Sequence, residues 1–317
     1  MIRVGIIGMG FMGGVHLRNW QTLSNAQVVA VCDANPIATT AKQGNIDTGA
    51  DALNLDGIAI HTDVAEMLAR EQLDAVSIAL PTHLHKTVAI QCLEAGTHVL
   101  CEKPMALNLP DCDAMVAAAK QAEKHLMVAH CIRFWPAYAW VKQAVDGGLY
   151  GEVRVAGFSR LTYAPSWDDN AWLSDPAKSG GLALDLHIHD LDFIQYLFGS
   201  PAGIRSVCTA NRHIQTQLDY GHCAVSATAS WMMPQSFGFK MAFSILFENA
   251  ALLFDGTTLK LYQGDEEPVE PELSEGDGYH WEIEHFAGLI SGTIEEPAIT
   301  PEQARESVRM ALETIKR

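Results

Sequence analysis

The sequence is poor in positive charge. It contains 21 lysines and arginines against 38 aspartates and glutamates, which gives a formal net charge of −17 at pH 7. Nucleic-acid backbones and anionic membrane surfaces attract proteins mainly through basic side chains. The composition therefore argues against a nucleic acid or a membrane as the partner of this chain.

Two further features are missing. No apolar run reaches the ~20 residues of a membrane span, and the opening MIRVGIIGMG lacks the basic region and cleavage site of a signal peptide. The seven cysteines are scattered and form no C-x-x-C pair. We therefore expect a reduced, cytoplasmic protein whose cysteines are mostly small core residues.

The material that is present is sufficient for two domains. The chain has 317 residues, of which 48% are hydrophobic and 19% charged. This length exceeds that of one compact core, and the composition is typical of a globular protein. We expect the domain boundary near residue 130, with domains 1–130 and 131–317.

The first domain alternates short apolar runs with helical stretches, which predicts a doubly wound parallel sheet with ligands at the carboxyl ends of its strands. The expected strands are Ile2–Ile7, Gln27–Cys32, Ala75–Leu80, His98–Cys101 and Met127–Cys131. The expected helices are one that runs through Trp20, one within His61–Glu71, Thr87–Glu94 and Asp111–Lys124.

The first strand runs into the G-x-G-x-x-G pattern of a dinucleotide-binding fingerprint, with Phe11 and Met12 opening the next helix. In this pattern Gly8 permits a tight turn, Gly10 lets the backbone approach a pyrophosphate, and Gly13 lets the helix pack against the strand. The helix N-terminus offers free N–H groups to the phosphates.

A carboxylate follows the second strand at the spacing that ribose recognition requires. Asp33 comes twenty residues after Gly13, and no arginine follows it closely. A carboxylate there accepts hydrogen bonds from the ribose hydroxyls and repels a 2′-phosphate. The sequence therefore favours NAD over NADP.

Lys103 follows a predicted strand within the tripeptide Glu102-Lys103-Pro104. Pro104 favours an extended conformation at Lys103, which would carry the ammonium to the ligand edge of the sheet. A lysine at that edge can hold a substrate hydroxyl or take part in proton transfer.

The segment Gly180–Gly199 fits two periodicities. As a strand it would project Asp185, His187 and His189 from one face, an arrangement suited to a metal. As a helix it would place Asp185 and His189 on one face, and His187 would point away. The segment taken alone leaves both alternatives open.

Five segments make the chain similar to the Gfo/Idh/MocA family of oxidoreductases. They are VGIIGMGFMGGVH at Val4–His16, LPTHLH at Leu80–His85, EAGTHVLCEKPMALN at Glu94–Asn108, RFWP at Arg133–Pro136 and SGGLALDLHIHDLDF at Ser179–Phe193. The resemblance implies an α/β protein with an N-terminal Rossmann domain and a C-terminal α+β domain built on a large, mostly antiparallel sheet. It further implies NAD(P)-dependent oxidation or reduction of a sugar, inositol or related polyol.

The resemblance also implies roles for individual residues and favours the helical alternative for Gly180–Gly199. Lys103 would lie near nicotinamide and substrate, His189 would be the acid/base, and Asp185 its partner. Many members have T-P-N where this chain has Leu80-Pro81-Thr82, and His187 stands where relatives often have a small residue. The expected cofactor-binding residues are Gly8, Gly10, Phe11, Met12, Gly13, Asp33, Leu80, Pro81, His85, Glu102 and Lys103, and the expected substrate-binding residues are Arg133, Trp135, Trp172 and His187.

The rest of the chain predicts a second sheet. The expected strands are Val153–Arg160, Ile204–Ala210, His222–Trp231, Gly238–Glu248, Ala251–Phe254 and Leu259–Gln263, and the expected helices are Ala137–Asp146, Gly278–Ile290 and Thr300–Lys316. One face of such a sheet needs a cover of helices or of another subunit. We therefore expect a homodimer or homotetramer formed through this sheet.

Three other functions compete with a dehydrogenase. The H-x-H pairs His83/His85 and His187/His189 invite a metal-dependent hydrolase or lyase, although that function leaves the glycine fingerprint unexplained. A nucleotide-sensing protein without turnover is the second alternative. An NAD-assisted glycosidase, in which the cofactor cycles without net change, is the third.

Overall fold

The computed structural model describes residues 1–38, 52–165 and 172–316, which form two compact units. The first unit comprises Met1–Cys131, Ala177–Ser179 and Tyr279–Arg305. The second comprises Ile132–Pro176, Gly180–Gly278 and Glu306–Arg317, and residue 317 itself is not described.

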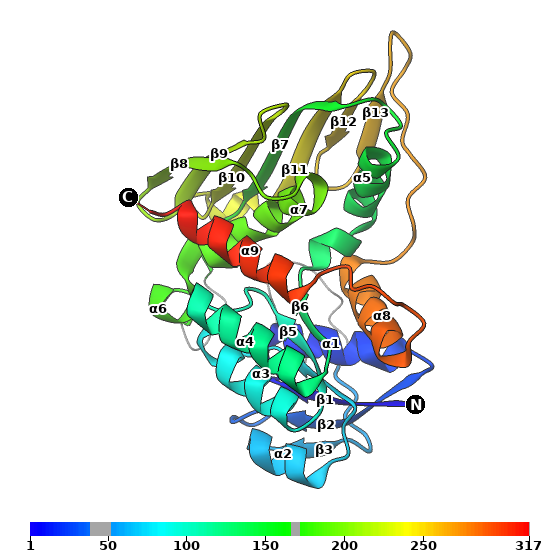
Figure 1. Ribbon diagram of the computed structural model, residues 1–317, viewed down its shortest axis with the longest axis vertical. Helices are drawn as coiled ribbons and strands as arrows, with labels where there is room; N and C mark the ends of the chain where they lie inside the picture. Colours follow the sequence, from blue (N-terminus) through cyan, green and yellow to red (C-terminus); the bar gives the residue numbers. More distant parts are fainter. Residues whose placement is uncertain (39–51, 166–171, 317) are drawn as a thin grey trace. The chain divides into compact units, whose positions relative to one another are not determined.

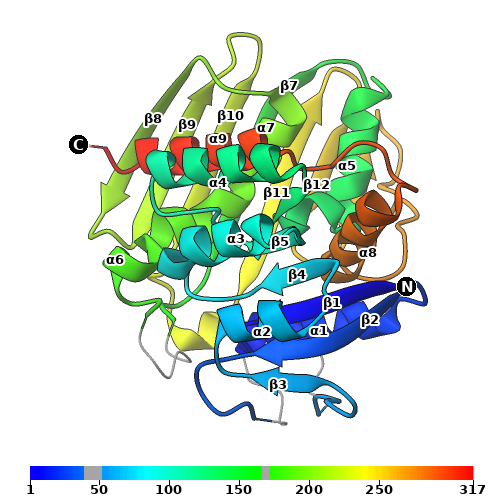
Figure 2. The same cartoon turned by 60° about the horizontal axis from the view of Figure 1, so that its bottom comes forward.

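The first unit is built on a six-stranded parallel sheet with the order β3-β2-β1-β4-β5-β6 (Figures 1 and 2). Its strands are β1 (Ile2–Ile7), β2 (Ala26–Cys32), β3 (Ala59–His61), β4 (Ala75–Ile78), β5 (His98–Glu102) and β6 (Leu126–Ala129). Its helices are α1 (Phe11–Thr22), α2 (Val64–Arg70), α3 (His85–Glu94), α4 (Leu109–Ala122) and α8 (Gly278–Ser291). The strand order reverses at β1 and β4, and such a reversal opens a ligand crevice at the carboxyl ends of the strands.

The helices of this unit begin where local sequence dictates. Asp63 caps α2 by accepting a hydrogen bond from the Glu66 N–H, and Asn108 caps α4 by accepting from the Asp111 N–H. Both contacts satisfy an amide that has no partner within its own helix. The doubly wound parallel sheet expected from the alternation of strands and helices is confirmed.

The second unit is built on a seven-stranded sheet with the order β13-β12-β11-β7-β10-β9-β8. Its strands are β7 (Val153–Leu161), β8 (Gly203–Thr209), β9 (His213–Asp219), β10 (Ala224–Ser230), β11 (Lys240–Phe247), β12 (Ala251–Phe254) and β13 (Leu259–Tyr262). Only the β7–β10 pair in this order is parallel. The expected mostly antiparallel sheet is confirmed, but the sequence analysis did not expect β9, nor β3 of the first unit.

Helices of this unit lie against one face of the sheet. They are α5 (Pro136–Asp146) and α7 (Ile188–Phe198), accompanied by α9 (Pro301–Glu313), which passes from the first unit into the second (Figure 1). The short α6 (Pro176–Ser179) precedes α7 in the chain. Burial alternates along the strands, as in β11, where every second residue from Met241 to Phe247 is buried. The core of the unit therefore lies between the helices and this face of the sheet.

No helix in the described part of the chain is both long and apolar enough to cross a membrane. The cysteines are all free thiols, and five of the seven are buried.

Candidate active site

The glycine loop has the geometry that a bound dinucleotide needs. A Cβ on Gly13 would lie 1.9 Å from the Gly8 carbonyl oxygen, and Gly8 itself has φ +90° with the Ala79 carbonyl 2.5 Å from its Cβ position. A Cβ on Gly10, in contrast, would meet nothing within 4 Å. Gly8 and Gly13 are thus required by the fold of the loop, whereas Gly10 leaves open space beside the N-terminus of α1, where a pyrophosphate can approach the backbone.

Alanine substitutions at the two positions are expected to have different effects. Gly13→Ala should lower the unfolding temperature, because its methyl group collides with backbone. Gly10→Ala should leave that temperature unchanged and raise the dissociation constant for NAD about tenfold or more, because its methyl group occupies the space for the phosphates. Calorimetric unfolding and titration with NAD measure both effects, and a Gly10→Ala protein that binds NAD like the wild type would contradict this assignment.

Asp33 follows β2 and joins the glycine loop directly. Its Oδ2 accepts a hydrogen bond from the Met9 N–H at 2.8 Å, and its Oδ1 accepts one from the Asn35 N–H at 2.8 Å. The side chain remains partly exposed. The carboxylate therefore stands beside the loop as ribose recognition requires, and it also braces that loop, a second role that the spacing alone did not indicate. Phe11 and Met12 open α1 and are half-buried.

A buried charged group stands at the last residue of β5. The Glu102 Oε1 lies 3.0 Å from the His16 Nε2, and its Oε2 accepts from the Lys103 N–H at 3.1 Å. Burial by itself raises the pKa of Glu102, but the His16 hydrogen bond and the charges of His16 and Lys103 outweigh it and hold that pKa below its usual value. Glu102 is therefore a buried anion next to Lys103. Sequence analysis gave no role to His16, because its partner lies 86 residues away.

Lys103 itself is half-buried directly after β5, where the strand ends. The chain bends over Lys103, Pro104 and Met105, and the Lys103–Pro104 peptide bond is cis. An extended conformation was expected at Lys103, and the structure shows a bend over this segment. The expected position at the carboxyl end of the strand is correct, because the strand ends at Glu102.

His85 was expected to bind the cofactor, and the structure gives it another task. Its ring is fully buried, with Nε2 2.7 Å from the Leu80 carbonyl oxygen and Nδ1 2.9 Å from the Pro104 carbonyl oxygen. Both nitrogens are thus occupied by backbone, so the ring links the segment after β4 to the bend after β5. Burial is the main cause that lowers its pKa, and the two backbone contacts act against it. Leu80 and Pro81 are half-buried beside this link.

The segment Gly180–Gly199 is helical. A π-helical turn over Ala183–His187 runs directly into α7, with the Ile188 N–H bonded to the Ala183 carbonyl. Such π turns are rare in proteins, and those that occur are often found at functional sites. The helical alternative favoured by the resemblance is confirmed, and the strand alternative is wrong.

Asp185 and His189 occupy the one side of this segment that is not packed away. Both are half-buried, and the intervening residues, together with every residue from Asp190 to Gln195, are buried. His189 is thus the only residue from Leu186 to Gln195 that is not buried. The Nδ1 atom of its ring is itself buried. The helix therefore presents one carboxylate and one imidazole, four residues apart, out of an otherwise closed core.

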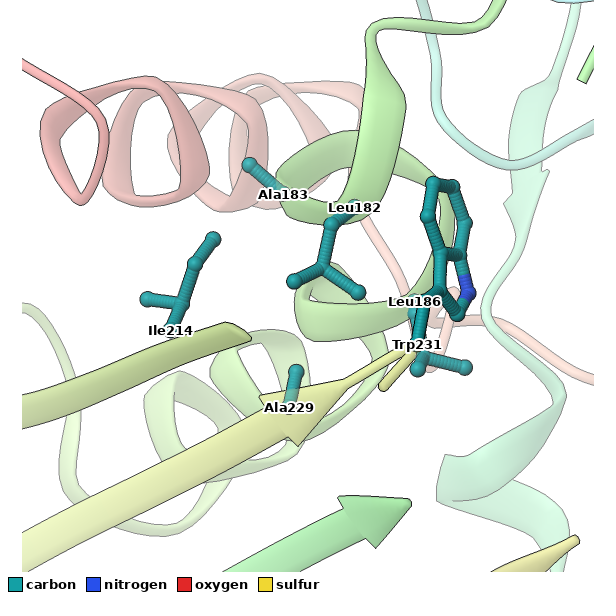
Figure 3. Close-up of a cluster of buried hydrophobic side chains, with 6 residues drawn as sticks. All are labelled: Leu182, Ala183, Leu186, Ile214, Ala229 and Trp231. Atoms are coloured by element: carbon teal, nitrogen blue, oxygen red, sulfur yellow. The ribbon is translucent and has the colours of Figure 1, made fainter. Parts of the chain in front are cut away.

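The seat of this segment is an apolar cluster on the second sheet (Figure 3). Leu182 points toward Ile214 on β9 and Ala229 on β10, and Leu186 lies beside Trp231. All of them are buried, and their packing holds the π-helical turn against the sheet.

His187 was expected among the substrate contacts, and the structure places it in the core of the second unit, so its substrate role stays a prediction. The side chain is fully buried, and its Nε2 lies 2.8 Å from the Thr216 hydroxyl on β9. Burial, followed by the charge of Arg160, lowers the pKa of His187 to about 3. The ring is therefore neutral at physiological pH and anchors the segment to the sheet, while His189 faces the other way.

Arg133 was also expected to contact the substrate, a role that stays a prediction, and the structure places it in the core. Its Nε and Nη2 donate to the two carboxylate oxygens of Asp192, both at 2.8 Å, and both side chains are buried. Trp135 immediately precedes α5 and is half-buried, as is Trp172, so their substrate roles stay predictions. Trp167 lies outside the described residues.

The two H-x-H pairs do not form metal sites. His83 is exposed while His85 is buried, and His187 is buried while His189 is half-buried. Among the residues that the structure describes, no group of three or more histidine, cysteine, aspartate or glutamate side chains is arranged to hold a metal ion.

Comparison with known families agrees with this geometry. Residues 2–130 match the model of the Gfo/Idh/MocA oxidoreductase family with an NAD-binding Rossmann fold, and residues 138–251 match the model of the Gfo/Idh/MocA C-terminal domain. The chain belongs to the Gfo/Idh/MocA family. Its N-terminal part is therefore an NAD-binding Rossmann domain, and its C-terminal sheet is the second domain of that family.

Two curated relatives illustrate the range of the family. The chain is 32% identical to the 2,7-anhydro-N-acetylneuraminate hydratase of Mediterraneibacter gnavus, over 61% of this chain and 48% of the relative. It is 30% identical to the myo-inositol 2-dehydrogenase of Thermotoga maritima, over 62% of this chain and 55% of the relative. The chain thus spans about half the length of the curated relatives it matches.

A solved structure covers nearly the whole chain. Levoglucosan dehydrogenase, in its complex with NADH and levoglucosan, superposes with a TM-score of 0.82, at 21% identity and over 99% of this chain and 96% of that one. At this identity the likeness establishes the fold.

Proposed function

We propose that this chain is an NAD(P)-dependent dehydrogenase or reductase that transfers hydride between nicotinamide and the hydroxyl or carbonyl carbon of a sugar, inositol or related polyol. The observation that carries the proposal is the presentation of Asp185 and His189 from a closed helical core, in a chain whose other domain binds NAD. Buried, rigid neighbours hold such a pair in place, as acid–base catalysis requires.

Each residue then has a definite task. His189 accepts the proton of the substrate hydroxyl during oxidation and returns it during reduction, because an imidazole exchanges protons near neutral pH. Asp185, on the same side of the helix, stabilises the protonated ring. Lys103 polarises the reacting oxygen by its positive charge. Nicotinamide, when bound, supplies the carbon that takes up or releases the hydride.

The chain's own residues fit a bound dinucleotide. The open space at Gly10 and the free N-terminus of α1 would hold the pyrophosphate, and Asp33 would accept from the ribose hydroxyls. The proposed preference is NAD over NADP, because the carboxylate of Asp33 repels a 2′-phosphate.

Removal of this charge tests the preference. Asp33→Asn keeps an acceptor for the Met9 N–H and removes the repulsion, so the ratio of kcat/KM for NAD to that for NADP should fall about tenfold or more. Steady-state kinetics with both cofactors measures the ratio, and Asp33→Glu, which keeps the charge, is the control. An unchanged ratio in Asp33→Asn would show that Asp33 does not select the cofactor.

A second function deserves a direct test because one relative is a hydratase acting on an anhydro sugar. In that function, which corresponds to the NAD-assisted chemistry considered above, the cofactor would be used and regenerated within each turnover. Net accumulation of NADH separates it from a dehydrogenase.

The decisive experiment is a panel of sugars, inositols and anhydro sugars offered to the purified chain with NAD and NADP. Absorbance of the reduced nicotinamide and chromatography of the products are followed in parallel. Reduced cofactor formed in step with product supports the dehydrogenase, whereas product without reduced cofactor supports the second function. Neither product nor reduced cofactor with any compound would reject both.

The second sheet has an uncovered face that fits another copy of the chain. Val155, Leu246 and Tyr262 are 44%, 48% and 38% exposed, and strand pairing aligns them in one row across β7, β11, β12 and β13. Exposed apolar rows of this kind are typical of protein interfaces. We therefore place the proposed dimer contact on this face.

Leu246→Arg is expected to convert the oligomer to monomers, because it introduces a charge into the middle of the apolar row. Light scattering coupled to size-exclusion chromatography measures the mass. Ile60→Arg, at an apolar residue of the first unit that is even more exposed than Leu246, is the control and should leave the mass unchanged. A Leu246→Arg protein with the wild-type mass, or a monomeric wild type, would refute the interface.

A further inference from the structure

Two buried ion pairs hold α7 at Asp190 and Asp192, directly after His189 in the chain. Asp190, in the first turn of the helix, accepts from Arg160 Nη2 at 2.8 Å, and Asp192 accepts two hydrogen bonds from Arg133. The side chains of all four residues are at most 2% exposed. A buried carboxylate needs a compensating partner, and each of these two accepts hydrogen bonds from an arginine.

The partners come from separate elements of the second unit. Arg160 lies on β7, where its Nη1 contacts the Met241 sulfur of β11. Arg133 lies in the short turn before α5, with its guanidinium 4.5 Å from the ring centre of Tyr196. The helix is therefore tied at one point to the sheet and at another to the segment that leads into α5.

A third tie reaches α9. The Ser307 hydroxyl lies 2.8 Å from the Asp192 Oδ1 and 2.9 Å from the Gln195 Oε1. Asp192 thus receives hydrogen bonds from two elements at once, and its carboxylate is held on both sides. The position of this carboxylate on α7 is consequently set by the turn that carries Arg133 and by α9.

The two pairs act on opposite flanks of the catalytic side chain. Successive helical residues are turned by about 100°, so Asp190 lies about 100° from His189 on one flank and Asp192 about 60° from it on the other. Two fixed points on opposite flanks prevent rotation of the helix about its axis. A turn of about 10° would move an atom about 5 Å from that axis by about 0.9 Å, and displacements near 1 Å can reduce catalysis by about 10²-fold.

We propose that the Arg160–Asp190 and Arg133–Asp192 ion pairs are positioning elements that fix the rotation of α7 and so aim His189 at its substrate. The proposal rests on the proposed function, because it assigns His189 its acid–base role. It goes beyond that function by naming the residues that act through His189 without touching the substrate.

The test removes the Arg160–Asp190 pair without leaving a buried charge. In the double variant Arg160→Met/Asp190→Leu, apolar side chains of similar size replace both partners, so the fold can be retained. The expected result is a fall in kcat of about 10- to 100-fold, with KM and the dissociation constant for NAD within twofold of wild type. Asp190→Asn, which keeps an acceptor for Arg160, should recover part of the lost kcat.

A control variant separates an effect on the position of His189 from a general loss of stability. Leu261→Ala lies on β13, three strands from β7 in the sheet, and removes a buried side chain without touching α7. It should lower the unfolding temperature and leave kcat unchanged. A double variant whose kcat stays within twofold of wild type, or a Leu261→Ala protein that loses kcat to the same extent, would overturn the proposal.

A second readout needs no substrate. The imidazole resonances of ¹³C,¹⁵N-labelled His189, assigned by comparison with His189→Asn, should shift in the double variant and stay unchanged in Leu261→Ala. Unshifted His189 resonances in the double variant would overturn the positioning role. If no compound of the panel is turned over by the wild type, the proposed function fails, and the resonances still decide whether the ion pairs set the placement of His189.

Discussion

Replacement of His189 by alanine is expected to lower kcat by about 10²- to 10⁴-fold, the usual contribution of a positioned acid–base group. His189 is the accessible residue in a stretch of α7 that is otherwise buried, and loss of its imidazole removes the group proposed to carry the substrate proton. The glycine loop and Asp33 belong to the other unit, so the dissociation constant for NAD should not change.

The measurement combines steady-state turnover on the best compound of the panel with a fluorescence titration of NADH. His222→Ala is the matched control, because His222 is an exposed histidine in a turn of the same unit. It should turn over like the wild type. Full activity in His189→Ala would exclude His189 as the acid–base group, and loss of NADH binding in that variant would show that the effect lies in cofactor binding.

Asp192→Ala is expected to destabilise the second unit by about 3–5 kcal/mol, because it leaves the Arg133 guanidinium buried without its carboxylate. This is a large part of the ~5–15 kcal/mol by which a domain is normally stable. The double variant Arg133→Met/Asp192→Leu should recover most of the loss, since apolar side chains can replace a buried ion pair.

Denaturant unfolding measures the change in the free energy of unfolding, and hydrogen exchange measures the local change at α7. The control is Arg154→Ala, which removes an ion pair with Glu248 at partly exposed side chains. That variant should lose at most about 1 kcal/mol. An Asp192→Ala protein that loses less than about 1 kcal/mol would show that the pair contributes little, and a double variant no more stable than Asp192→Ala would show that the buried charge is not the cause.

The ion pairs and the π-helical turn together explain how one short segment serves two needs. Its inward residues, such as His187 and Leu186, hold it on the sheet, and its outward residues, Asp185 and His189, remain accessible. A π turn contains one residue more than an α-helical turn, so it changes which side of the helix the following residues face. The orientation of the proposed catalytic pair therefore depends on contacts from several elements of the second unit.

Local signals in the sequence predicted most of the first unit. The strand, the glycine pattern and the following helix lie within twenty-two residues, and the steric need for Gly13 arises from the Gly8 carbonyl within the same loop. The apolar runs of the parallel strands are long enough to be recognised, because both faces of such strands are buried. The doubly wound sheet could therefore be predicted from the order of these signals.

The strand β9 could not be predicted in this way. Its sequence HIQTQLD has only two large apolar residues, because every second residue points away from the core. The polar Thr216 at its buried position hides the alternation further, and it is buried only because His187 supplies a hydrogen-bond partner. Such a position becomes recognisable only when the partner is known.

The sequence by itself determined that the chain has a parallel sheet with a dinucleotide-binding fingerprint, a second sheet, and a D-x-x-x-H pair on one segment. These features depend on glycine geometry, hydrophobic periodicity and short spacings. Only the tertiary structure decided that His187, His85 and Arg133 are buried anchors, and that Tyr279–Arg305 returns to the first unit. The physical reason is that burial and pairing depend on partners distant in the chain, such as Asp192 for Arg133 and Thr216 for His187, which only folding brings together.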